Sequence, residues 1–252
     1  MTNSERIPWK RLTAEGAAIV VSILLAFWID AWWEDREQTQ QLIGNLQALE
    51  EEMENNQREF SRSLDLIAGF FEKMDSVFET LADQDPEALT DEFLIDVGRS
   101  YLIQLVNVTN SAYDVVVSPE NLRLVGNAEF RSSLIEARKA FLHIDLNEQV
   151  LWSEYTDKQG PFLASSGLIN ELGWPERQEA EFQSGFLRPL RSPPFARDTS
   201  ALFTGEFWFL YEHWRMTYFD FVAAVIRARE AEERALELLR NELAQLTGTP
   251  SE

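Results

Sequence analysis

Residues 42 to 81 read LIGNLQALEEEMENNQREFSRSLDLIAGFFEKMDSVFETL, a stretch with no proline and only two glycines. Its apolar side chains recur every seven residues, at Leu46, Met53, Phe60, Ile67, Met74 and Leu81. Two further apolar rows flank this one, and Asn56 and Ser63 interrupt the pattern. A stripe this wide is typical of a long helix packed into a bundle, rather than of a two-stranded coiled coil.

Towards the N-terminus the same helix can continue into an apolar segment. Residues 12 to 33, LTAEGAAIVVSILLAFWIDAWW, would form about 33 Å of helix at ~1.5 Å per residue, which matches a hydrocarbon core of roughly 30 Å. No charge lies between Glu15 and Asp30, and tryptophans flank both ends. Because no small-x-small cleavage site follows, we predict an uncleaved transmembrane signal anchor rather than a secretory signal peptide.

The basic residues near this segment predict its orientation. Arg6, Lys10 and Arg11 precede it, and only Arg36 lies within the fifteen residues that follow it. Since basic residues remain on the cytoplasmic side, residues 1 to 11 form a predicted cytoplasmic tail. We therefore expect a single-pass protein of a bacterial inner membrane, with its C-terminal domain in the periplasm.

One side of the predicted anchor carries small side chains. A residue that allows close helix packing recurs every four positions, at Ala14, Ala18, Ser22 and Ala26, and Asp30 comes next in this row. Such a ridge allows two transmembrane helices to approach closely, so it is a candidate packing face for a second copy or a partner. Alternatively, the alanines reflect the ordinary composition of such helices and Asp30 reaches interfacial water.

The charge of the chain is concentrated beyond the anchor. Residues 34 to 252 hold 19 basic and 40 acidic groups, which is the whole formal charge of −21. This surface would repel phosphate backbones, so nucleic acid is excluded as a partner. The acidity indicates either a soluble or salt-adapted surface or an acidic binding face.

The absence of cysteine excludes disulfides, thiolate metal sites and cysteine nucleophiles.

The remaining sequence also predicts helices and no sheet. After a break at Pro86, the apolar periods and cap residues indicate helices at about 91–105, 119–126, 127–155 and 206–246. Asn127 is the expected cap of the third of these helices, and Gly248 and Pro250 are expected to end the last. The last helix is nearly as long as the first and could pack antiparallel to it. The predicted fold is mainly α: a transmembrane helix that runs into an elongated antiparallel helical bundle, residues 34 to 252.

Residues 158 to 204 form a predicted Pro-rich crossover between helices. Five of the nine prolines lie in this segment, which is longer than an ordinary connection. It also gathers arginines in an otherwise acidic chain: Arg177, Arg188, Arg191 and Arg197. The segment is either a binding loop for an anionic partner or an ordered crossover whose arginines pair with the protein's own acids.

We find no catalytic, cofactor-binding or metal-binding motif. A di-iron carboxylate bundle requires Glu-x-x-His, but Ala140 and Leu210 stand three residues before His143 and His213. The sequence has no G-x-S-x-G nucleophile elbow and no Gly-rich phosphate loop. No catalytic residue, metal ligand or cofactor is therefore predicted.

Aromatic side chains provide the remaining candidate site. The block FWFLYEHWRMTYFDF opens the last helix, and its spacing suits either a core or a pocket. The candidate ligand or partner surface comprises Tyr101, Trp208, Tyr211, Trp214, Arg188 and Arg191.

The leading hypothesis is a non-enzymatic, membrane-anchored protein that self-assembles or serves as an accessory subunit of a membrane complex. The alternative is a periplasmic ligand-binding or sensor-like bundle that signals through a partner.

Two blocks of the chain resemble a bacterial protein family. The first comprises Glu15-Gly16, Leu24-Leu25-Ala26-Phe27 and Trp32. The second comprises Ser111-Ala112-Tyr113-Asp114, Asn121-Leu122, Leu124, Asn127 and Phe130-Arg131. Together they resemble an uncharacterised family of small bacterial single-pass membrane proteins. The resemblance implies an anchor and a helical domain, and it implies no catalytic residue.

Overall fold

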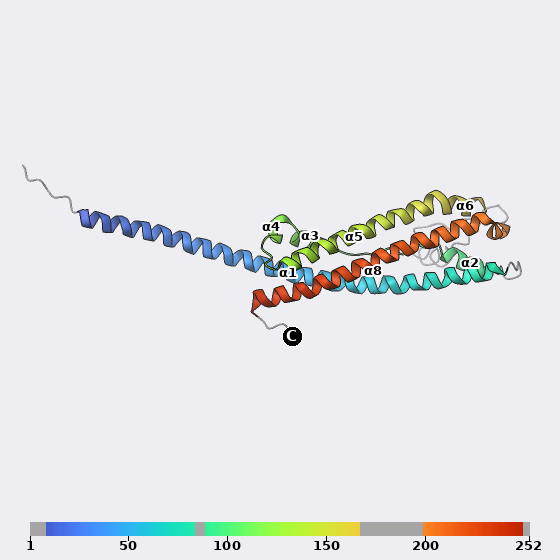
Figure 1. Ribbon diagram of the computed structural model, residues 1–252, viewed down its shortest axis with the longest axis horizontal. Coiled ribbons are helices and arrows are strands. Elements are labelled where there is room, and N and C mark those ends of the chain that lie inside the picture. Colours follow the sequence, from blue (N-terminus) through green and yellow to red (C-terminus); the bar gives the residue numbers. More distant parts are fainter. Residues whose placement is uncertain (1–8, 84–88, 167–198, 249–252) are drawn as a thin grey trace, which may run out of the picture.

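A single helix, α1 (Trp9–Ala82), runs for 74 residues without interruption through the computed structural model (Figure 1). At ~1.5 Å per residue it is about 110 Å long. The structure describes residues 9–83, 89–166 and 199–248, with side chains from Ile19 onward except that of Asp91. The predicted continuity between residues 12–33 and the long helix that contains residues 42–81 is confirmed, because α1 includes both without a break.

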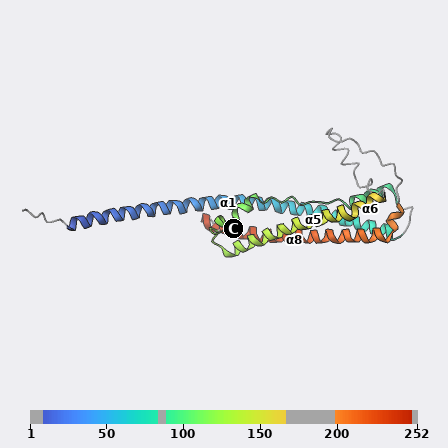
Figure 2. The same cartoon turned by 90° about the horizontal axis from the view of Figure 1, so that it is seen from above.

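Two further long helices complete the bundle: α8 (Gly205–Thr247) packs along the C-terminal half of α1, and α5 (Ala128–Glu154) packs along α8. Both views show that α8 runs antiparallel to the other two, while the N-terminal part of α1 projects beyond the bundle (Figures 1 and 2). The described residues contain no strand, so the predicted mainly helical fold is confirmed. The apolar row of α1 that recurs every seven residues faces the core. Each of its members is at most 1% exposed: Leu46, Met53, Phe60, Ile67, Met74 and Leu81.

The ends of several helices follow from local capping. At the N-termini of α2 (Asp91–Arg99), α5 and α8, the first backbone N–H groups donate to the side chains of Thr90, Asn127 and Thr204. These bonds satisfy donors that have no partner inside a helix. Gly248 ends α8 with a left-handed φ of 70°, which a glycine adopts without steric cost. The predicted roles of Asn127 and Gly248 are therefore confirmed.

The predicted helix at 91–105 is wrong in its length, because α2 ends at Arg99. Residues 102–110 have no regular structure and lead back along the bundle to α3 (Ser111–Val116) and α4 (Pro119–Leu122) (Figure 1). The short helix predicted at 119–126 also ends early, at Leu122. We call residues 100–110 the crossing segment.

Side chains from the long helices bind the backbone of the crossing segment. Trp214 Nε1 donates to Ser100 O at 2.9 Å, and the Gln104 N–H donates to Tyr218 Oη at 3.0 Å. The amide of Asn56 binds both backbone groups of Thr109, at 2.8 and 2.9 Å. These bonds explain why the segment need not be helical, since its buried polar groups find partners elsewhere.

Glu52 on α1 provides the cap that α3 lacks. Its carboxylate accepts bonds from Ser111 Oγ and from the Ala112 and Tyr113 N–H groups, each at 2.9 Å. The preceding residue, Asn110, makes no side-chain cap. An anion at this position satisfies free donors at the start of the helix and complements its dipole.

Glu232 lies fully buried between α1 and α8, at the position where it interrupts the apolar period of α8. Its carboxylate accepts from Asn56 Nδ2 at 2.9 Å and from Gln57 Nε2 at 3.0 Å. Burial raises the pKa of the Glu232 carboxyl to about 7, although the two amide bonds lower it, and nearby Glu52 raises it further. The interruption in the sequence pattern is therefore a polar contact inside the core.

The predicted crossover at 158–204 begins later than expected. After α5 the chain continues through a π-helical turn, η2 (Tyr155–Gln159), and α6 (Gly160–Ser165). Pro161 fits in the first turn of α6, where a missing N–H costs little. Residues 167–198, with Arg177, Arg188, Arg191 and Arg197, lie outside the described residues. The 3-10 helix η4 (Thr199–Phe203) then leads into α8.

Where side chains are described, no helix carries an apolar stretch long enough to cross a bilayer. The first part of the predicted anchor, residues 12–18, belongs to α1, but its side chains lie outside the described residues.

Glu52→Gln should lower the free energy of unfolding by about 1–3 kcal/mol, because an NH2 group would then face the N–H donors of α3. Chemical denaturation followed by circular dichroism measures this loss. The matched control is Glu51→Gln, which changes an exposed neighbour on α1 and should leave stability within error. Equal effects from both substitutions would contradict the capping role of Glu52.

Glu232 should also make stability depend on pH. Its pKa is about 7 in the fold and 4.5 in the unfolded chain, so between these values only the folded state keeps the proton. The free energy of unfolding therefore falls as the pH rises from about 4.5 to about 7, in total by about 3 kcal/mol, and then levels off.

Glu232→Gln should remove this part of the pH dependence, which denaturation of wild type and variant at several pH values measures. Identical pH profiles for the two proteins would contradict the assignment. Glu233→Gln is the matched control, because Glu233 is exposed on the same helix.

Candidate functional site

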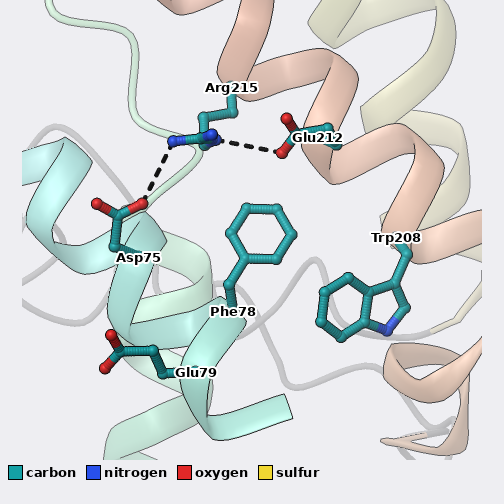
Figure 3. A pocket seen from close by; sticks show the side chains of 6 residues that line it. All are labelled: Asp75, Phe78, Glu79, Trp208, Glu212 and Arg215. Carbon is teal, nitrogen blue, oxygen red and sulfur yellow. Dashed lines mark hydrogen bonds and ion pairs between the residues drawn. The ribbon is translucent and has the colours of Figure 1, made fainter. Parts of the chain in front are cut away.

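A solvent-open hollow of about 510 Å³ lies between the end of α1 and the start of α8 (Figure 3). It is lined by Asp75, Phe78, Glu79, Trp208, Glu212 and Arg215. The parts of α1 and α8 that line it lie at the end of the bundle farthest from the N-terminal part of α1 (Figure 1). We take it as the candidate functional site in the described part of the chain.

Helical spacing brings these six side chains together. On α1, Phe78 and Glu79 follow Asp75 by three and four positions. On α8, steps of four and three positions lead from Trp208 to Glu212 and then to Arg215, so each set lies on one side of its helix. Because α1 and α8 are antiparallel neighbours, the two faces meet. Among the described residues, the hollow therefore depends only on the packing of the two longest helices.

Aromatic rings form the inner surface of the hollow. The ring centroid of Phe78 lies 5.2 Å from that of Trp208 and 5.0 Å from that of buried Tyr211. The guanidinium carbon of Arg215 lies 5.8 Å from the Phe78 centroid, within range of a cation–π contact. Phe78 thus lies between a cation and a second aromatic ring (Figure 3).

The charges around the hollow do not balance. Arg215 NH1 lies 3.4 Å from Asp75 Oδ1, and Arg215 Nε lies 3.2 Å from Glu212 Oε2. Glu79 is exposed and has no ion-pair partner among the described residues. Three carboxylates and one guanidinium leave a net charge of −2. The Arg215 pairs are exposed to solvent, so they orient the side chains more than they stabilise the fold.

Of the predicted surface residues that the structure describes, only Trp208 lines the hollow. Tyr101, Tyr211 and Trp214 are at most 3% exposed and pack against one another in the core. Their helical spacing reflects the buried stripe of α8, and the polar groups of Tyr211 and Trp214 bind Ser100. Arg188 and Arg191 lie outside the described residues.

The two buried tyrosine hydroxyls beside Ser100 differ in their bonding. Tyr211 Oη donates to Ser100 Oγ at 2.7 Å, whereas Tyr101 Oη is buried without a hydrogen-bond partner among the described residues. Burial raises the pKa of both hydroxyls above the usual value, so both remain neutral. An unpaired buried hydroxyl carries a desolvation cost that a paired one recovers.

A second polar cluster joins the π-helical turn to α8. Glu154 is only 5% exposed, and its Oε2 lies 2.7 Å from Lys158 Nζ and 3.3 Å from His213 Nε2. Its other oxygen, Oε1, accepts a hydrogen bond from Gln159 Nε2. Sequence reasoning missed Glu154 because no motif marks it. Both carboxylate oxygens of Glu154 contact structural partners, whereas the buried Gln159 Oε1 has no hydrogen-bond partner among the described residues. We assign the cluster a role in joining α5 to α8.

The packing face predicted within the anchor is only partly described. Ala14 and Ala18 lie outside the described side chains, while Ser22, Ala26 and Asp30 are exposed along one row of α1. Large apolar side chains around them are 47% to 67% exposed: Ile19, Val20, Val21, Ile23, Leu24, Leu25, Phe27, Trp28, Ile29, Trp32 and Trp33. No part of the described bundle covers this surface.

The chain matches no known protein family, curated protein or solved structure. The resemblance to a family of single-pass membrane proteins therefore stays a prediction. In the described part of the chain, no group of His, Cys, Asp and Glu side chains could hold a metal ion. Function is accordingly inferred from the exposed apolar end of α1 and from the hollow.

Tyr101→Phe should leave stability unchanged or raise it by about 1 kcal/mol, because it removes a buried hydroxyl without a partner. Tyr211→Phe should instead lower stability by about 1 kcal/mol, because it breaks the bond to Ser100. Thermal and chemical denaturation of the two variants measure this opposite behaviour. A clear loss of stability in Tyr101→Phe would show that the hydroxyl has a partner.

Proposed function

We propose that the protein is a membrane-anchored helical bundle whose role is interaction, either by self-assembly or as an accessory subunit of a membrane complex. The observation that carries the proposal is the exposed apolar surface of α1, eleven large side chains between Ile19 and Trp33. Covering this surface would gain roughly 10 kcal/mol or more, since a fully buried large side chain gains about 1.5–3 kcal/mol. Such a surface requires an apolar environment.

A lipid bilayer suits this surface better than a protein groove does. The apolar side chains extend around the whole helix between residues 19 and 29, whereas a helix in a groove is apolar on one side. The full segment 12–33 has the length of a bilayer core, and tryptophans stand at both ends. The basic residues before it support a cytoplasmic N-terminus and a periplasmic bundle in a bacterial inner membrane.

The continuous helix supports a role in interaction. About fifty residues of α1 follow the anchor, so the end of α1 would stand about 70 Å from the membrane at ~1.5 Å per residue. The hollow would then face away from the bilayer, where a partner can reach it. The ridge of Ala14, Ala18, Ser22, Ala26 and Asp30 is the proposed contact for a second copy or a partner helix within the membrane.

The second candidate function is a ligand-binding or sensor-like bundle. The hollow favours it, because about 510 Å³ lies within the range of small-molecule sites. Occupation of the hollow would alter the contact between α1 and α8, and α1 leads directly towards the anchor. A partner protein would carry the signal onward.

Removal of residues 1–33 should move the protein from the membrane to the soluble fraction, because it deletes the exposed apolar surface. Fractionation of expressing cells, followed by carbonate washing of the membranes, measures the change. Full-length protein should remain in the washed pellet. Release of the full-length chain by carbonate would contradict the anchor, and circular dichroism of the truncated form would check that its bundle is folded.

Cysteines introduced at Ser4 and Ser251 extend the same experiment to orientation. An impermeant thiol reagent added to intact cells should label only the Ser251 position if the bundle is outside the cytoplasm. Light scattering of the full-length protein in mild detergent then measures its assembly. A strict monomer that co-purifies with nothing from native membranes would contradict the interaction role.

A further inference from the structure

The hollow already contains one cation, and the contacts of that cation define the chemistry of the site. The Arg215 guanidinium lies against the Phe78 ring and between the Asp75 and Glu212 carboxylates. The opposite part of the hollow offers the same two kinds of group, the ring of Trp208 and the carboxylate of Glu79 (Figure 3). No described cation pairs with Glu79.

Electrostatics decides which ligand class this second half can take. The six lining residues carry a net charge of −2 and belong to a chain with a formal charge of −21. An anion would be repelled, and the Arg215 guanidinium is already held by two carboxylates. A cation would gain attraction from Glu79 and from the faces of the aromatic rings. A metal ion does not fit, because the described residues offer no group of metal ligands.

The shape of the hollow favours a side chain over a free small molecule. Small-molecule sites normally bury most of their ligand, whereas this hollow is open to solvent and its acids are exposed. A Lys or Arg side chain needs only to insert its end, while the polypeptide that carries it covers the opening. The negative charge of the chain would also attract a basic segment from a distance.

We propose that the hollow binds a Lys or Arg side chain of a basic polypeptide segment, held between Trp208 and Glu79. This inference rests on the proposed function, because it names the chemistry of the partner that the bundle would meet. Phe78 separates the inserted cation from Arg215, and Asp75 and Glu212 keep Arg215 in place.

The test uses the full-length protein in detergent micelles, titrated by calorimetry with the peptide acetyl-Gly-Ser-Lys-Arg-Ser-Gly-amide. Trp208→Ala should weaken binding about fivefold, the usual size of an exposed cation–π contact. Glu79→Gln should weaken it about two- to fivefold, and higher salt should weaken it further. Glu79 is exposed, so its substitution leaves the bundle folded even if Trp208→Ala does not.

Two substitutions outside the hollow are the matched controls. Phe209→Ala removes an aromatic ring that is 69% exposed, and Glu237→Gln removes an exposed carboxylate of the same helix. Neither should change the affinity. Equal losses in the controls would show general attraction to an acidic surface and would overturn the proposal.

A neutral version of the peptide, with acetyl-lysine and citrulline in place of Lys and Arg, should not bind. Its binding would exclude recognition of charge and would overturn the proposal. Tetramethylammonium or free arginine amide that binds as tightly as the peptide would show a small-molecule site instead. Because these titrations are made in detergent, their failure leaves the membrane anchor untouched, and failure of the fractionation experiment leaves the hollow untouched.

Discussion

The fold depends on one constraint. The crossing segment packs against the bundle, but it forms no helix or sheet whose hydrogen bonds would pair its backbone N–H and C=O groups. A buried peptide group without a partner costs as much as a lost hydrogen bond. Here α8 supplies Trp214 and Tyr218, and α1 supplies Asn56. The crossing segment thus fixes how α1 and α8 lie beside each other, because a shift of one helix along the other would break these hydrogen bonds.

Polar residues inside the core follow from this constraint. Asn56 binds Thr109 with both ends of its amide group and so presents its remaining N–H to Glu232. Gln57 is fixed in the same way by the Arg229 carbonyl. A buried carboxylate that faces two donors with fixed orientation is satisfied only in the native packing. Such networks favour one arrangement of helices over others that bury the same apolar area.

The sequence predicts those features of the fold that depend on neighbours within a few turns. The heptad row of α1, the cap at Asn127 and the glycine at 248 are local, and all three agree with the structure. The end of α2 is not local, because it depends on residues more than 100 positions away in α8. The hollow is similar: Trp208 stands out in the sequence, but nothing there indicates that Asp75 meets Arg215.

The unbroken backbone of α1 also has a mechanical consequence. A continuous α-helix without proline is stiff to twisting, so the bundle sets the direction in which each side of its N-terminal portion points. Two chains that met along the row of small residues would therefore hold their hollows at one angle and one separation. A partner with two basic segments would be selected by the distance between them, and this selection would need no contact beyond the two hollows.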